Sequence, residues 1–191
     1  MAITQTDYAI AFIDYDNVAM ELFGRGDTVP ALAEIVHVAV EAVRRDLPFV
    51  RTLDLRLYGG WLDESGFFSS PAARLLPELR RFRGLRGGIR IATSLALALR
   101  GVPDCRLIGS LRVTASRRRQ KMVDGMLTLD ICFSASDPGV VVMISDDDDL
   151  VPAALMASRA GGTVHWLRLR DRPSCNDAML DRELVVFHPL R

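Results

Sequence analysis

The segment Gly139–Ser145, GVVVMIS, constrains the fold more than any other, because it is short and almost wholly apolar. A run of this kind suits a strand that is buried on both faces, as the strands of parallel sheets are. Tyr8–Asp14, YAIAFID, has the same character and ends in an acid. Because helical patterns lie between such segments, we expect a mainly parallel sheet with helices on both faces.

The remaining pattern fits one three-layer α/β/α domain covering residues 1–191, a length that can bury a substantial core. Apolar residues at helical spacing follow Pro30, and Gly161–Gly162 ends the last long helix. Residues 94–116 fit both a helix and a strand. The expected helices cover 31–45, 71–82, 120–135, 148–160 and a short stretch around 174–182, and the further strands cover 51–58, 88–93, 163–169 and 184–187.

Composition excludes several classes of protein. The chain has 24 basic and 24 acidic residues, so its overall charge does not indicate a nucleic-acid binder. No apolar run approaches the roughly 18 residues that cross a bilayer, and the N-terminus lacks a basic leader, so we expect a cytoplasmic protein without a membrane segment. The cysteines and histidines show no zinc-ligand spacing, and we interpret them as structural; they are Cys105, Cys132, Cys175, His37, His165 and His188.

Acidic residues gather where the two strongest strands end. Asp14 ends the first strand, and Asp146–Asp149 follow the strand that ends at Ser145. Asp124 lies three residues after Lys121 near the start of a predicted helix, on the same face of it. Ligands of parallel sheets bind at the carboxyl ends of the strands, so these three groups are expected to share one site.

Carboxylates placed close together repel one another unless a cation neutralises them. Oxygen ligands without histidine or cysteine favour Mg²⁺ or Mn²⁺, and Mg²⁺ commonly binds phosphate oxygens as well. The structural alternatives are that Asp146–Asp149 cap a helix and that Asp14 is a turn residue. Asp130 points to the apolar side of its helix, as a buried structural acid or a support for the site.

A basic run, Arg117–Arg119, precedes Lys121. It is either a solvated loop or a group of side chains that neutralises phosphates entering the acidic site. Tyr15 and Trp61 are candidates for stacking on a nucleobase, although packing in the core is the more common role for such residues.

Three segments together resemble the NYN domain family of PIN-like metal-dependent ribonucleases: FIDYDN (12–17), KMVDGMLTLD (121–130) and SDDDDLVP (145–152). The resemblance covers nearly the whole chain and implies a PIN-like fold that acts as an RNA endonuclease. It implies that Asp14, Asp124 and Asp147 hold Mg²⁺ or Mn²⁺ and that Asp149 assists. Asp146 stands where the family has a small residue, and 94–116 is an atypical insertion. We expect substrate contacts from Asn17, Lys121, Ser145 and Arg119.

Two other functions fit part of the pattern. Asp14, Asp16 and Val18 match the DxDx[TV] motif of haloacid-dehalogenase-like phosphatases, in which Asp14 is the nucleophile and Asp16 a general acid. That motif gives Asp124 no role. A domain that binds RNA or a protein without turnover is the second alternative, and a homodimer is compatible with the sequence.

Overall fold

The computed structural model describes residues 6–24, 29–62, 67–100, 111–114, 117–120, 123–136, 139–161, 163–169 and 185–190. The strands are β1 (Tyr8–Asp14), β2 (Thr52–Tyr58), β3 (Gly84–Arg86), β4 (Ile89–Leu95), β5 (Leu111–Thr114), β6 (Arg117–Gln120), β7 (Val140–Ile144), β8 (Val164–Arg168) and β9 (Val185–Pro189). The helices are α1 (Tyr15–Phe23), α2 (Val29–Asp46), α3 (Ser70–Arg81), α4 (Val123–Ser134) and α5 (Val151–Arg159), with a 3-10 turn, η2 (Asp148–Leu150), before α5.

Seven strands form one sheet in the order β3-β4-β2-β1-β7-β8-β9. Neighbouring strands run parallel except at the β3–β4 edge, which confirms the predicted α/β class and mainly parallel sheet. The chain proceeds from β1 outward to β2 and β4, and then crosses to β7 on the other side of β1. The connections therefore change direction between β1 and β7, which is where open α/β sheets bind ligands.

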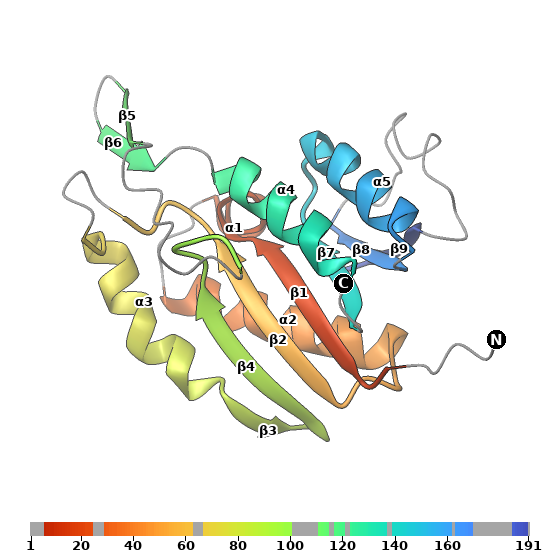
Figure 1. Ribbon diagram of the computed structural model, residues 1–191. Coiled ribbons are helices and arrows are strands. Elements are labelled where there is room, and N and C mark those ends of the chain that lie inside the picture. The colour runs from red at the N-terminus through yellow and green to blue at the C-terminus, as the bar shows by residue number, and fades with distance from the viewer. Residues whose placement is uncertain are drawn as a thin grey trace.

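Helices cover both faces of this sheet (Figure 1). One apolar cluster joins α1, α2 and α3 to the sheet, and a second joins α4 and α5 to the opposite face. Successive residues of β1 alternate between the two clusters, as Phe12 and Ile13 do, because side chains of a strand point to opposite faces. Both faces of β1 and β7 are buried, as their apolar runs predict.

Helix α1 is not predicted by the sequence pattern. Asp14 acts as its N-cap by accepting a hydrogen bond from the Asn17 backbone N–H, and Gly24 ends it with φ 66°. Only Tyr15, Val18 and Ala19 of α1 are buried, so its apolar stripe is too short to stand out. The residues after Asp14 therefore continue directly into a helix.

The basic run also differs from the expected loop. Strands β5 and β6 pair antiparallel as a two-stranded ribbon, with Arg112 opposite Arg119 and Thr114 opposite Arg117. Helix α4 then begins at Val123, three residues later than predicted. The predicted helix 148–160 is divided into η2 and α5. The short helix expected around 174–182 lies outside the described residues.

Two histidines that the sequence pattern presents as isolated from each other are in contact. His165 Nδ1 lies 3.0 Å from His188 Nε2, and His188 Nδ1 lies 3.5 Å from the carboxylate of Asp46. Register explains the contact, because His165 and His188 lie on adjacent parallel strands, two positions apart on the same face. In the portion of the chain that can be described, none of the helices has the length and apolar character needed to cross a membrane.

Candidate functional site at the carboxyl ends of β1 and β7

Asp14 occupies the end of β1 beside the point where the sheet connections change direction. It is only 5% exposed. The Ser145 hydroxyl, just beyond the end of β7, donates a hydrogen bond of 2.8 Å to Asp14 Oδ2, and the Asn17 backbone N–H donates one of 3.4 Å to Oδ1. The two neighbouring strand ends are thus joined through one carboxylate.

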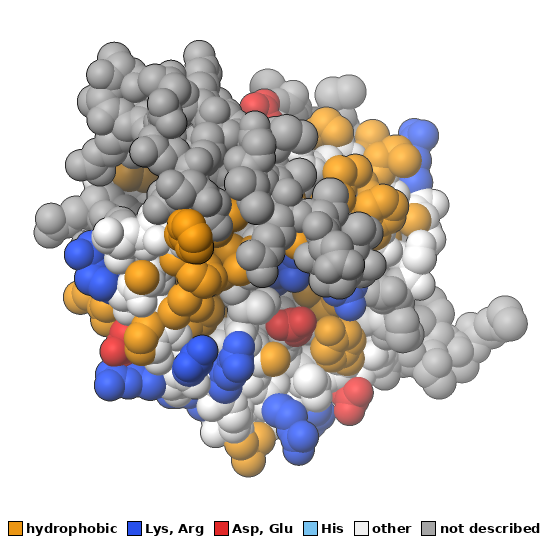
Figure 2. All heavy atoms as spheres, turned by 60° about the vertical axis from the view of Figure 1, so that its left-hand side comes forward, with side chains coloured by type: hydrophobic (Ala, Val, Ile, Leu, Met, Phe, Trp, Pro, Cys, Tyr) orange, Lys and Arg blue, Asp and Glu red, His pale blue; other side chains and the backbone are white. Residues whose placement is uncertain are grey.

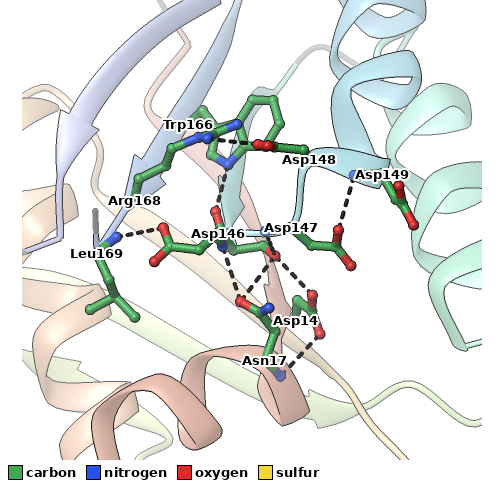
Figure 3. A network of polar contacts seen from close by, with 10 residues as sticks. Asp14, Asn17, Asp146, Asp147, Asp148, Asp149, Trp166, Arg168 and Leu169 are labelled. Atoms are coloured by element: carbon green, nitrogen blue, oxygen red, sulfur yellow. Dashed lines mark hydrogen bonds and ion pairs between the residues drawn. The ribbon is translucent and has the colours of Figure 1, made fainter. Parts of the chain in front are cut away.

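Asn17 and Ser145, which we predicted to contact substrate, hold this junction together (Figure 3). The Asp146 backbone N–H donates to Asn17 Oδ1 at 3.0 Å. The Asp147 backbone N–H donates to the Ser145 hydroxyl, also at 3.0 Å. Ser145 is 2% exposed, so its hydroxyl holds the neighbouring groups in place from the buried side of the site.

Two of the four consecutive aspartates have structural partners. Asp146 is 1% exposed and accepts a hydrogen bond of 2.8 Å from the Leu169 backbone N–H. Asp148 forms an ion pair of 3.1 Å with Arg168, whose guanidinium lies 4.0 Å from the centre of the Trp166 ring. These contacts tie the end of β7 to the end of β8, and they explain why the acidic run is longer than a site or a cap requires.

Asp147 and Asp149 are placed differently. The Asp147 carboxylate accepts a hydrogen bond of 2.9 Å from the Asp149 backbone N–H and so caps η2, as the structural alternative anticipated for at least one of these residues. Figure 3 shows the Asp147 carboxylate on the side of Asp14, whereas the Asp149 side chain points away from the network. Asp149 is exposed and Asp147 is partly exposed, so both carboxylates reach solvent.

Three of the predicted residues, Asp14, Asp124 and Asp147, interact electrostatically. The pKa of Asp14 is raised from 3.8 to about 6, mainly by burial and also by the negative charges of Asp124 and Asp147, against the lowering effect of the hydrogen bonds from Ser145 and Asn17. Asp124 is exposed in the first turn of α4. The site is therefore a buried carboxylate with two accessible acids close enough to perturb it.

The donor atoms here are all carboxylate oxygens, which suit a hard divalent cation in kind and charge. Among the described residues, however, no group of three or more His, Cys, Asp or Glu side chains is arranged to hold a metal ion. Mutual repulsion between the negative charges explains why these carboxylates lie in one site but do not converge on a single point. The chemistry of the donor set fits Mg²⁺ or Mn²⁺, although the side chains do not form a closed ligand shell.

The other predicted residues fall in several places. Lys121 lies outside the described residues, and Arg119 lies on β6. Tyr15 and Trp61 are buried and stack on each other with ring centres 5.0 Å apart, so both are core residues. Asp16 accepts a hydrogen bond of 3.0 Å from the Gly60 backbone N–H and so joins α1 to the segment after β2.

A buried network beside the site is predicted only in part, through Asp130, which the sequence pattern predicts as a buried structural acid or a support for the site. Asp130 is completely buried and accepts hydrogen bonds from the Tyr58 hydroxyl at 2.6 Å and from Arg56 Nε at 3.1 Å. The backbone N–H of Arg100 donates to its other oxygen at 2.7 Å, and the Arg100 guanidinium donates to Ser134. Two signals point to this network: Arg56 interrupts an apolar strand, and Asp130 lies on the apolar side of a helix.

Comparison with known proteins leaves the family open. No protein-family model matches this chain, and no curated protein matches it.

Proposed function

We propose that this protein is a metal-dependent ribonuclease with a PIN-like fold similar to that of NYN domains. The observation that carries the proposal is the position of Asp14, buried where the sheet connections change direction and perturbed by Asp124 and Asp147. Three carboxylates from distant parts of the sequence thus lie at the place where this class of sheet binds ligands. The α/β architecture and the order of the three motifs are compatible with the resemblance.

In this proposal Asp14, Asp124 and Asp147 hold the ion, and Asp149 assists from the exposed side. Mg²⁺ or Mn²⁺, when bound, supplies charge neutralisation and activation of water for attack on a phosphodiester. Ser145 and Asn17 fix Asp14 and the start of the acidic run, which orients the ligands before substrate arrives. Arg119 and Lys121, which precede α4 and Asp124 in the chain, are the proposed phosphate contacts.

The test is cleavage of labelled single-stranded and hairpin RNAs in Mn²⁺, Mg²⁺ or EDTA. Asp147→Asn should lower the rate at least about 100-fold, because it removes a charged ligand. Asparagine is also a good N-cap, so η2 and the fold are expected to persist. Asp148→Asn is the matched control, since Asp148 lies in the same acidic run but pairs with Arg168, and this variant should retain most activity.

Loss of cleavage in both variants would mean that any substitution in the acidic run abolishes activity. This outcome would count against the assignment of Asp147 as a metal ligand. If the folded wild-type protein cleaves no RNA, small phosphate esters are the next substrates. Hydrolysis of these esters, together with a phosphoaspartyl analogue trapped on Asp14, would support a phosphatase and rule out the ribonuclease.

A further inference from the structure

Positive charge is concentrated in one stretch of this otherwise neutral chain. Residues 74–90 include six arginines and a single acid, Glu78, whereas the whole chain has equal numbers of basic and acidic residues. The stretch forms most of α3, all of β3 and the start of β4, at the edge of the sheet farthest from β9. The arginines are Arg74, Arg80, Arg81, Arg83, Arg86 and Arg90.

Four arginines lie around the β3–β4 edge and the neighbouring start of β2, and we call this group the basic edge: Arg51, Arg81, Arg86 and Arg90. The Arg90 backbone N–H donates to the Arg51 carbonyl at 2.7 Å, and Arg86 Nη2 donates to the Arg81 carbonyl, also at 2.7 Å. Register pairs Arg86 with Ile89, so the Arg86 side chain lies on one face of the sheet, whereas Arg90, the next residue, points to the other face. The basic edge therefore wraps around the β3–β4 edge of the sheet. All four residues are exposed.

Most of this charge is not balanced locally. Arg81 pairs with Glu78 at 2.7 Å, but the contacts found in the described structure include no carboxylate partner for Arg51, Arg86 or Arg90. Figure 2 brings this side of the molecule forward and shows basic side chains in the lower part of the face. Since Lys121 is the only lysine and lies outside the described residues, these side chains are arginines.

We propose that the basic edge is a second contact surface for RNA, which binds the phosphate backbone at a distance from the carboxylate site. The substrate class rests on the proposed function. Arginine forks match phosphate oxygens, and exposed uncompensated arginines gain most from a polyanion. By contrast Arg56, which is partly buried, and Arg168, which is buried, are paired with Asp130 and Asp148.

Register gives the separation of the two surfaces. Arg90 lies beside Thr52 at the start of β2, and Asp14 lies beside Tyr58 at its end. Six strand positions correspond to about 20 Å. Roughly six stacked nucleotides span that length at about 3.4 Å each, so an RNA longer than this can contact both surfaces.

The test measures binding of a labelled 25-nucleotide single-stranded RNA in EDTA, where cleavage is not required. The triple variant Arg51→Gln, Arg86→Gln, Arg90→Gln should weaken binding about 10- to 100-fold and reduce the salt slope by about 2, from three lost phosphate contacts. A charge-matched control on the opposite helical layer, Leu129→Glu, Met156→Glu, Arg159→Gln, should change affinity less than about 3-fold. Replacing the same three arginines by lysine should retain most of the salt slope.

Equal effects of the triple variant and its control would overturn the proposal, because net charge alone would then explain binding. Unchanged affinity in the triple variant would also overturn it. The arginines would then only prevent the edge strand from pairing with another chain. Polyglutamate that binds as tightly as RNA would reassign the surface to an acidic protein. If RNA binds through the basic edge but is never cleaved, this inference stands and the proposed activity fails.

Discussion

Two buried aspartates lie on the same side of the sheet, and the charged residues next to them have opposite signs. Asp130 is in contact with Arg56 and the Tyr58 hydroxyl, so its charge is balanced by a neighbouring cation and by hydrogen bonds. Asp14, beside Tyr58 in the register, has Asp124 and Asp147 as its charged neighbours, and its pKa is raised to about 6. A compensated buried acid supports the fold, whereas an uncompensated one retains charge that a ligand can neutralise.

The comparison makes the two aspartates respond oppositely to loss of charge. Asp130→Ala should destabilise the protein by about 3–5 kcal/mol, because it leaves the largely buried Arg56 without its counter-ion. Urea unfolding followed by circular dichroism measures this. A loss below about 1 kcal/mol would show that the Asp130 network contributes little to stability and would remove the distinction.

Asp14→Asn should stabilise the metal-free protein by about 1–3 kcal/mol at pH 8, since a rise in pKa of about 2 units corresponds to about 3 kcal/mol at most. An acid whose pKa is raised on folding opposes folding above its unfolded value of 3.8, and fully so above about 6. The gain should therefore be complete above pH 6 and decrease as the pH falls towards 4. The measurement is urea unfolding in EDTA across that range.

Added Mn²⁺ sharpens the same experiment. It should raise the melting temperature of the wild-type protein, because an ion that binds only the folded state stabilises it, and should raise that of Asp14→Asn much less. A destabilised Asp14→Asn protein in EDTA would contradict the interpretation of Asp14 as an uncompensated functional acid.

The histidine pair is a second titrating group that overlaps the acid range of Asp14. The pKa of His165 is lowered from 6.5 to about 4, mainly by burial and also by the charge of His188, against an opposing effect of Asp46. A lowered pKa stabilises the fold above 6.5, and this contribution is lost as the pH falls towards 4. Between pH 7.5 and 5 the wild-type protein should lose about 1–2 kcal/mol through this group, after allowance for solvent screening.

His165→Gln should remove that loss and leave the opposite trend of Asp14 visible. Arg45, which pairs with Asp46, also faces His188 and should be kept unchanged. Denaturant midpoints of the variant and the wild type, measured in EDTA at half-unit pH steps, provide the comparison. An identical pH dependence in the two proteins would show that His165 does not titrate in this range.

Sequence patterns predict the parallel sheet and the gathering of acids at its edge because both can be inferred from residues that are close together in the sequence. Continuous apolar runs identify β1 and β7, and parallel topology places their carboxyl ends together. Patterns do not separate the members of Asp146–Asp149, because Leu169 and Arg168, which engage two of them, come from another strand. The distinction depends on tertiary contacts that spacing along the chain does not encode.

The same limit explains the elements that were missed. In the basic ribbon, β5 lies within residues 94–116, which fit both a helix and a strand, whereas β6 is wholly polar and resembles a loop. Helix α1 buries only a few side chains. Asp130 is the instructive intermediate case. Helical spacing places it on the apolar side of α4, but only the structure shows that Arg56, from a strand far away in sequence, neutralises it.

Tyr58→Phe tests whether the two aspartates are independent. Burial raises the pKa of the Tyr58 hydroxyl above its usual value, so the group stays protonated and donates to Asp130. Removing it should cost about 1–2 kcal/mol, because Asp130 keeps Arg56 and Arg100 as donors. The Mn²⁺-induced rise in melting temperature should be unchanged, since the Tyr58 hydroxyl donates to Asp130 and is not among the groups that shift the pKa of Asp14. A reduced response to Mn²⁺ would mean that the network positions the site, and the division between a structural and a functional aspartate would no longer hold.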